Sequence, residues 1–150
     1  MTMKKIAVAT GVTATVLTST LVAAPDAHAA SRVLTIGNNC YGPNPNYLGF
    51  PFYGGANITT NAPWPGQITI NSDSKDVLPY TTYTTVKVTT LSNNRTQTFR
   101  RTWHHTMGDD SGYTITGIKA SGRVKVTISA INVGLFQTQR GPTCSGIVRV

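Results

Sequence analysis

The chain has 150 residues, 39% of them hydrophobic, and a formal net charge of +8 at pH 7. It contains no glutamate and only five aspartates, so carboxylates for acid–base catalysis are scarce. Outside the N-terminal region, no apolar stretch approaches the roughly 20 residues that a membrane-spanning helix needs. The composition therefore argues against a hydrolase with paired carboxylates and against a membrane-spanning helix beyond the N-terminal region.

Residues 1–29 have the three parts of a secretory signal peptide. Two lysines form a positive start, and residues 6–24 are apolar and threonine-rich without a charge. Ala27 and Ala29 are the small residues that a signal peptidase reads before its cut. We expect cleavage after Ala29, with Ala30 as the alternative. The expected product is a bacterial, secreted or extracellular protein, with cell-wall association as one form of this location.

Residues 30–150 are expected to form one domain that is large enough for its own hydrophobic core. Loss of Lys4, Lys5 and Asp26 with the signal peptide leaves 11 basic and four acidic residues, a formal charge of +7. This excess favours polyanionic partners such as cell-wall polymers or acidic polysaccharides, although it also keeps a protein soluble. We expect no nucleic-acid partner, no cofactor and a monomeric protein.

Cys40 and Cys144 are the only cysteines, and an even number in an exported chain favours a disulfide. They have no C-x-x-C spacing, so neither a redox motif nor a metal site is indicated. A bond between them would close a loop of about 100 residues. It would join the first strand, or its exit, to the segment before the last strand.

Short alternating segments rich in threonine, valine and isoleucine recur along the chain, which is typical of β-strands. The first predicted strand is 32–37, with Leu34 and Ile36 on one face. The segments 56–60 and 67–71 follow as two short strands that are joined by a turn.

The segment 41–55 differs from its surroundings because it contains four glycines, three prolines and five aromatic residues. Glycine and proline at this density exclude a regular strand. The rings are suited to a flat platform for sugars or to a hydrophobic patch for a protein. The alternative is that they fold back and close the end of the core. The aromatic members of the predicted site are Tyr41, Tyr47, Phe50, Phe52, Tyr53 and, nine residues beyond the segment, Trp64.

A long hairpin is predicted in the middle of the chain, from 81–91 to 95–103. Its first arm has valines on the inner face and a lysine between them. On its second arm Arg101 shares a face with Phe99 and Trp103. This requires either that the arginine snorkels to solvent or that a bulge shifts the register.

A second hairpin is predicted from 112–118 to 122–131, and 146–150 is predicted to be the last strand. About seven or eight short strands at this spacing are typical of a two-sheet sandwich. The predicted fold is therefore an all-β, immunoglobulin-like β-sandwich with one disulfide, and a small β-barrel is the alternative.

No constellation of catalytic or metal-binding residues is recognisable. His104 and His105 are adjacent, so on a strand they point to opposite faces and cannot easily share a metal ion. With Asp109 or Asp110 as a third ligand, the spacing matches no zinc or calcium pattern. We expect no catalytic residue, no metal ion and a protein that is not an enzyme.

Two hypotheses for the function remain. The first is a secreted binding protein that contacts an anionic cell-envelope polymer or a carbohydrate. Its basic strand faces, represented by Lys87, Arg123 and Lys125, would supply salt-dependent contacts, and the aromatic rings would supply salt-resistant ones. The second is a secreted protein–protein effector or inhibitor that uses the segment 41–55 as a rigid plug.

Overall fold

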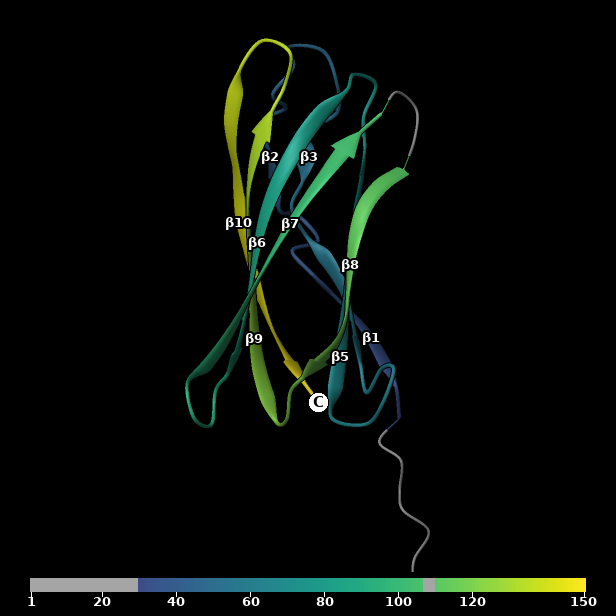
Figure 1. Cartoon of the computed structure of the whole chain (residues 1–150), viewed down its shortest axis with the longest axis vertical. Coiled ribbons are helices and arrows are strands. Elements are labelled where there is room, and N and C mark those ends of the chain that lie inside the picture. The colour runs from purple at the N-terminus through teal and green to yellow at the C-terminus, as the bar shows by residue number, and fades with distance from the viewer. Residues whose placement is uncertain (1–29, 107–109) are drawn as a thin grey trace, which may run out of the picture.

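The computed structural model describes residues 30–106 and 110–150, so the predicted signal peptide (1–29) and Asp109 lie outside the described residues. Two four-stranded antiparallel sheets face each other, and a two-stranded ribbon lies beside them (Figure 1). The predicted all-β sandwich with one disulfide is confirmed, and the described strands do not close into a barrel. This is the two-layer architecture of immunoglobulin-like domains.

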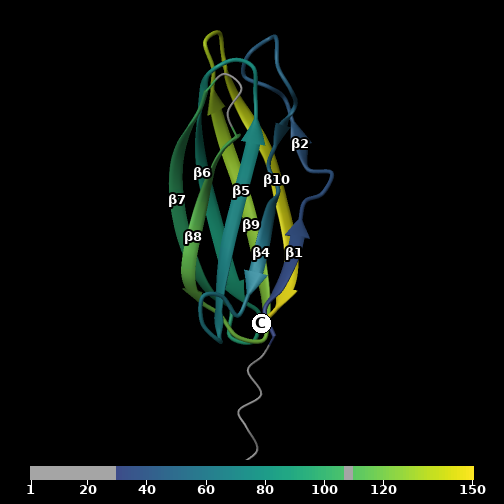
Figure 2. The ribbon, with the colours of Figure 1, turned by 90° about the vertical axis from the view of Figure 1, so that its right-hand side faces the viewer.

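The first sheet has the order β1-β4-β5-β8 and the second has the order β10-β9-β6-β7. The first sheet consists of β1 (Arg32–Ile36), β4 (Ala56–Thr60), β5 (Gln67–Lys75) and β8 (Asp110–Lys119). The second consists of β6 (Tyr80–Thr90), β7 (Arg95–His105), β9 (Arg123–Val133) and β10 (Thr138–Arg149). The ribbon consists of β2 (Tyr41–Gly42) and β3 (Phe52–Tyr53). Figure 2 looks onto the first sheet, with the second sheet behind it.

The hydrophobic core lies between the two sheets and follows from the alternation within each strand. Val86 and Val88 of β6 are fully buried, as their pattern predicted. Ile58 of β4 and Ile70 of β5 meet them from the first sheet and are equally buried. Since both sheets bury one face, the opposite faces of both sheets remain available to solvent.

The predicted central hairpin is confirmed as β6 and β7. Their pairing runs without interruption from Tyr80 opposite His105 to Thr90 opposite Arg95. The continuous register rules out the predicted alternative of a bulge beside Arg101. The Arg101 side chain is exposed although it lies on the inward side of β7, which is an edge strand of its sheet.

The predicted second hairpin is wrong. β8 pairs with β5 in the first sheet, whereas β9 pairs with β6 and β10 in the second. The turn 120–122 therefore carries the chain from one sheet to the other, and Gly122 provides its left-handed conformation (φ 67°). The two strands instead bury their apolar faces in the same core from opposite sheets.

The last strand is longer than predicted and begins at Thr138. Gly141 and Pro142 do not end it, because the register shifts between Arg140 and Thr143 and the bulge absorbs both residues.

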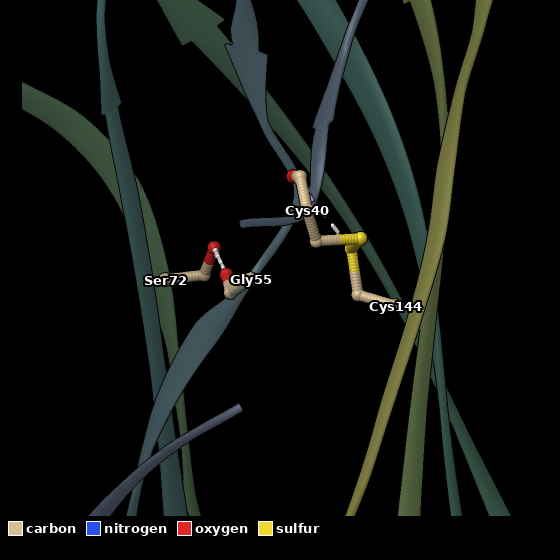
Figure 3. The surroundings of a disulfide bond; sticks show 4 residues. All are labelled: Cys40, Gly55, Ser72 and Cys144. Carbon is tan, nitrogen blue, oxygen red and sulfur yellow. Dashed lines mark hydrogen bonds between the residues drawn. A yellow bond between two sulfur atoms is a disulfide. The ribbon is translucent and has the colours of Figure 1, made fainter. Parts of the chain in front are cut away.

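The predicted disulfide between Cys40 and Cys144 is confirmed, with a Cα–Cα distance of 5.9 Å. It ties the exit of β1 to β10, and so links the two sheets (Figure 3). Ser72 of β5 donates a hydrogen bond of 2.7 Å to the Gly55 carbonyl beside the bond. A Cβ atom at Gly54 would lie only 2.9 Å from the Cys144 sulfur, so glycine is required there. The disulfide thus anchors both ends of the aromatic segment.

Candidate functional site

The outer face of the second sheet carries most of the basic side chains of the domain. Because side chains alternate along a strand, residues that pair across the sheet point to the same side. Six exposed basic residues point outward from these four strands, and we call this set the cationic face. Its members are Lys87, Arg100, Arg123, Lys125, Arg140 and Arg149. The described residues of the four strands include no aspartate or glutamate.

Hydroxyl side chains lie between these charges. Thr85 pairs with Arg100 on one side and with Ser129 on the other. Lys87 pairs with Thr127 in the next row of the sheet. The face therefore combines positive charge with many hydrogen-bond donors, which suits phosphate, sulfate or carboxylate groups.

The predicted binding residues Lys87, Arg123 and Lys125 all lie on this face. Arg100 joins them, whereas Arg101, its neighbour in sequence, shares the inward side of β7 with Trp103. Arg100 was not among the predicted residues, although the alternation within β7 places it on the side opposite to Trp103. Arg140 was missed because the following Gly141 and Pro142 hid the strand.

A groove of about 360 Å³ crosses the cationic face. Arg100 comes from β7 and Arg140 from β10, the two outer strands of the sheet, and both line the groove. Tyr83 and Ile131 line it from the central strands. Two guanidinium groups around one groove can hold an anion from two sides, with the tyrosine ring as an apolar surface between them.

Three of the predicted aromatic residues gather at a second, shallow pocket of about 370 Å³. Tyr41, Phe50 and Tyr53 line it together with Asp73 and Lys75 of β5. The rings of Tyr41 and Tyr53 are 5.4 Å apart. Partial burial raises the pKa of Tyr53, and the nearby Tyr41 and Asp73 add to this effect. The Tyr53 hydroxyl therefore stays protonated at neutral pH and can donate a hydrogen bond.

The other predicted aromatic residues do not belong to this pocket, so a single aromatic platform is not formed. Phe52 is buried, and its ring packs 6.3 Å from that of Trp103 in the core. Trp64 is exposed in the turn 61–66, which contacts the β8–β9 turn through a hydrogen bond from Ala120 to Gly66. That turn lies at the end of the sandwich opposite to the segment 41–55 (Figures 1 and 2).

A third pocket, of about 450 Å³, lies at the same end as Trp64 and was not predicted. Arg95, Lys119 and Gln67 line it, and Gln97 closes one side by donating a 2.8 Å hydrogen bond to the Lys119 carbonyl. Sequence reasoning missed it because its walls come from three separate turns.

The two histidines point to opposite faces, as predicted. His104 is exposed and lies 2.9 Å from the Thr81 hydroxyl on the outer face. His105 is buried and stacks on Tyr80 with ring centroids 3.7 Å apart, and its Nε2 lies 3.0 Å from the Thr82 hydroxyl. No group of three or more histidine, cysteine, aspartate or glutamate side chains in the described part of the chain could hold a metal ion.

His105 makes the stability of the domain depend on pH. Burial lowers its pKa from 6.5 to about 4, although an interaction with the backbone of Ser74 opposes the shift. His105 is therefore protonated below about pH 6.5 in the unfolded chain, but only below about pH 4 in the folded domain. We expect the stabilising contribution of neutral His105 to be complete above about pH 6.5, and the domain to lose about 2–3 kcal/mol of stability between pH 7 and 4.5.

Urea denaturation at several pH values measures this loss. In a His105→Gln variant the stability should depend less on pH, whereas a His104→Gln variant should keep the dependence of the wild type. Identical pH slopes for wild type and His105→Gln would contradict the assignment.

The fold and this surface define the class of the protein: an all-β sandwich with one disulfide that presents a cationic face. Comparison with family models, with curated proteins and with solved structures finds no match for the chain. Nor does any helix among the described residues have the length and apolar character to cross a membrane. A function must therefore be inferred from the chemistry of the surface itself.

Proposed function

We propose that the protein is a secreted, non-enzymatic binding protein that contacts an anionic cell-envelope polymer or carbohydrate. The observation that carries the proposal is the uniform sign of charge on the cationic face, where none of the described side chains is acidic. The outer face of the first sheet differs, because Asp73 accompanies Lys75 and Lys119 there. More than half of the basic side chains of residues 30–150 thus lie on one face, and this favours a polyanionic partner over a role in solubility alone.

The spacing of the charges favours an extended ligand. Arg123 is the first residue of β9, and Ile131, which pairs with Arg140 of β10, lies eight positions further along β9. The cationic face therefore extends over roughly 25 Å at the rise of a β-strand. Lys87 and Lys125 lie between the two ends, and Arg100 and Arg140 flank the groove beyond them. A polymer with repeated phosphate or carboxylate groups can contact several of these cations at once, and a small anion cannot.

The aromatic pocket favours a sugar component in this ligand. The ring faces of Tyr41 and Phe50 can stack on the apolar face of a sugar, and Asp73 and the Tyr53 hydroxyl offer an acceptor and a donor to its hydroxyl groups. Contacts of this kind are little affected by salt, whereas contacts of the cationic face are screened.

The double substitution Arg100→Gln/Arg140→Gln tests the charged site. We expect it to weaken binding to the isolated cell-wall fraction roughly tenfold or more at low salt, because each surface cation contributes about 1 kcal/mol toward an anionic surface. At about 0.5 M salt the charge-dependent part of the binding is screened, so wild type and variant should bind with the same weak affinity. Co-sedimentation over a range of protein concentrations measures both affinities.

The matched control is Arg32→Gln/Lys119→Gln, which removes the same charge outside the cationic face. Equal losses in the two variants would show that net charge alone acts, and would contradict a defined site. Binding that survives high salt but is lost in Tyr41→Ala would assign recognition to the aromatic pocket. Failure of the wild type to bind at either salt concentration would reject an envelope ligand.

A further inference from the structure

One end of the sandwich presents large apolar side chains to solvent. The loops 43–51 and 134–137 meet there, at the top of Figures 1 and 2, and the rings of Tyr47 and Phe136 are 5.7 Å apart. We call Tyr47, Leu48, Leu135 and Phe136 the apolar tip, and they are 78%, 73%, 64% and 65% exposed. Neither loop contains a charged residue. Four such side chains together form a patch that a soluble surface rarely leaves uncovered.

The two asparagine side chains of the loop 43–51 bond to neighbouring loops beneath the apolar tip. Asn46 is buried, its Oδ1 accepts a 2.9 Å hydrogen bond from the Leu135 amide, and its Nδ2 donates to the Pro79 carbonyl. Asn44 donates to the carboxylate of buried Asp76. These bonds hold three separate loops together.

The usual polarity of a surface loop is thus inverted, since its polar groups are satisfied inside and its apolar groups face out. Asp76 also accepts a 2.7 Å hydrogen bond from the Val77 amide, so the buried carboxylate has backbone as well as side-chain donors. Moving such a surface from water into an apolar environment costs little free energy, because few polar groups lose their hydrogen bonds.

We propose that the apolar tip inserts into the interface of a lipid bilayer that carries anionic headgroups. The charge of the neighbouring face supports this occupant. Exposed Val133 and Ile131 continue the apolar surface from the tip onto the second sheet, and the groove with Arg100 and Arg140 follows. Arg140 is four residues beyond Phe136, roughly 13 Å along the strand.

The dimensions of a bilayer interface match this arrangement. Interfacial segments bury their apolar groups about 5–10 Å below the headgroups, and polybasic surfaces are attracted to anionic lipid. With the tip inserted to this depth, Arg140 and Arg100 come to the level of the lipid phosphates. The proposal goes beyond the binding of an envelope polymer, because it uses residues outside the cationic face.

Sedimentation with vesicles tests the insertion. The purified, disulfide-bonded protein is mixed with vesicles of phosphatidylcholine alone or with a third of phosphatidylglycerol. We expect binding to the anionic vesicles, and a loss of at least tenfold in the Leu48→Ser/Phe136→Ser variant, because two exposed apolar side chains no longer enter the lipid. The matched control is Trp64→Ser, since Trp64 is as exposed as Phe136 (68%) but lies at the opposite end. It should bind like the wild type.

A fluorescent reporter distinguishes insertion from adsorption by charge. In a Trp64→Phe background, Phe136→Trp should give a blue-shifted emission on anionic vesicles, while buried Trp103 contributes a constant signal. Absence of vesicle binding, binding that the tip variant leaves unchanged, or binding without a blue shift would each overturn the proposal. The proposal would also be overturned if the protein does not bind vesicles but captures a soluble protein, and this capture is lost in the tip variant. Arg100→Gln/Arg140→Gln should weaken binding to the cell-wall polymer, whereas Leu48→Ser/Phe136→Ser should leave that binding unchanged. The two proposals can therefore fail separately.

Discussion

Replacing both Cys40 and Cys144 by alanine is expected to lower the free energy of unfolding by about 4–5 kcal/mol. The two residues are separated by 104 positions, and a cross-link over so long a loop removes much of the conformational entropy of the unfolded chain. This loss is comparable to the whole stability of many domains of this size. Urea denaturation of the oxidised wild type and of the variant measures the difference.

Reduction of the wild-type disulfide under native conditions is the control, and it should reproduce most of the effect of the double substitution. The loss should be largest at the segment 41–55, since the bond anchors it next to Cys40 and Gly54. Limited proteolysis of the variant should therefore cut within this segment first. A change in stability of less than about 1 kcal/mol would mean that the unfolded chain is already compact without the bond.

The second large effect is expected for Phe52→Ala, at about 3–5 kcal/mol of lost stability. Phe52 is only 2% exposed and contacts the rings of Trp103 and His105 between the sheets. Its removal leaves a cavity in a core that the surrounding strands cannot easily close. Thermal or urea unfolding of the purified variant measures the loss.

Phe50→Ala is the matched control, because it removes the same ring two positions earlier, where the side chain is 58% exposed. It should change the free energy of unfolding by no more than about 0.5 kcal/mol. Equal losses in the two variants would contradict the placement of Phe52 in the core. The comparison also separates the two roles that the aromatic segment was predicted to have, since one phenylalanine closes the core and the other lines the surface pocket.

The candidate site was only partly accessible from the sequence. Lys87 and Lys125 could be assigned to solvent because each lies between buried valines on its own strand. That Arg100 and Arg140 flank one groove depends on how four strands are ordered, and no local pattern reports that order. The aromatic residues show the same limit, because Phe50 and Phe52 have similar neighbours in sequence and opposite environments.

The apolar tip was also beyond local reasoning. Tyr47 was among the predicted binding residues, but Phe136, its partner in the tip, is 89 positions away. The inversion of polarity in these loops depends on bonds from Asn44 and Asn46 to the residues around Pro79 and Leu135. Such contacts can be recognised only when the loops are seen together.

What the sequence determined by itself was the local structure. A two-residue period of apolar side chains specifies a strand and its buried face, and the short turn between β6 and β7 specifies a hairpin. What only the tertiary structure decided was which strands share a sheet. β8 and β9 are neighbours in sequence but belong to different sheets, whereas β6 and β9 pair across a long separation. The physical reason is that a strand's alternation says which face is buried, but its partner is chosen by the packing of all the apolar faces into one core.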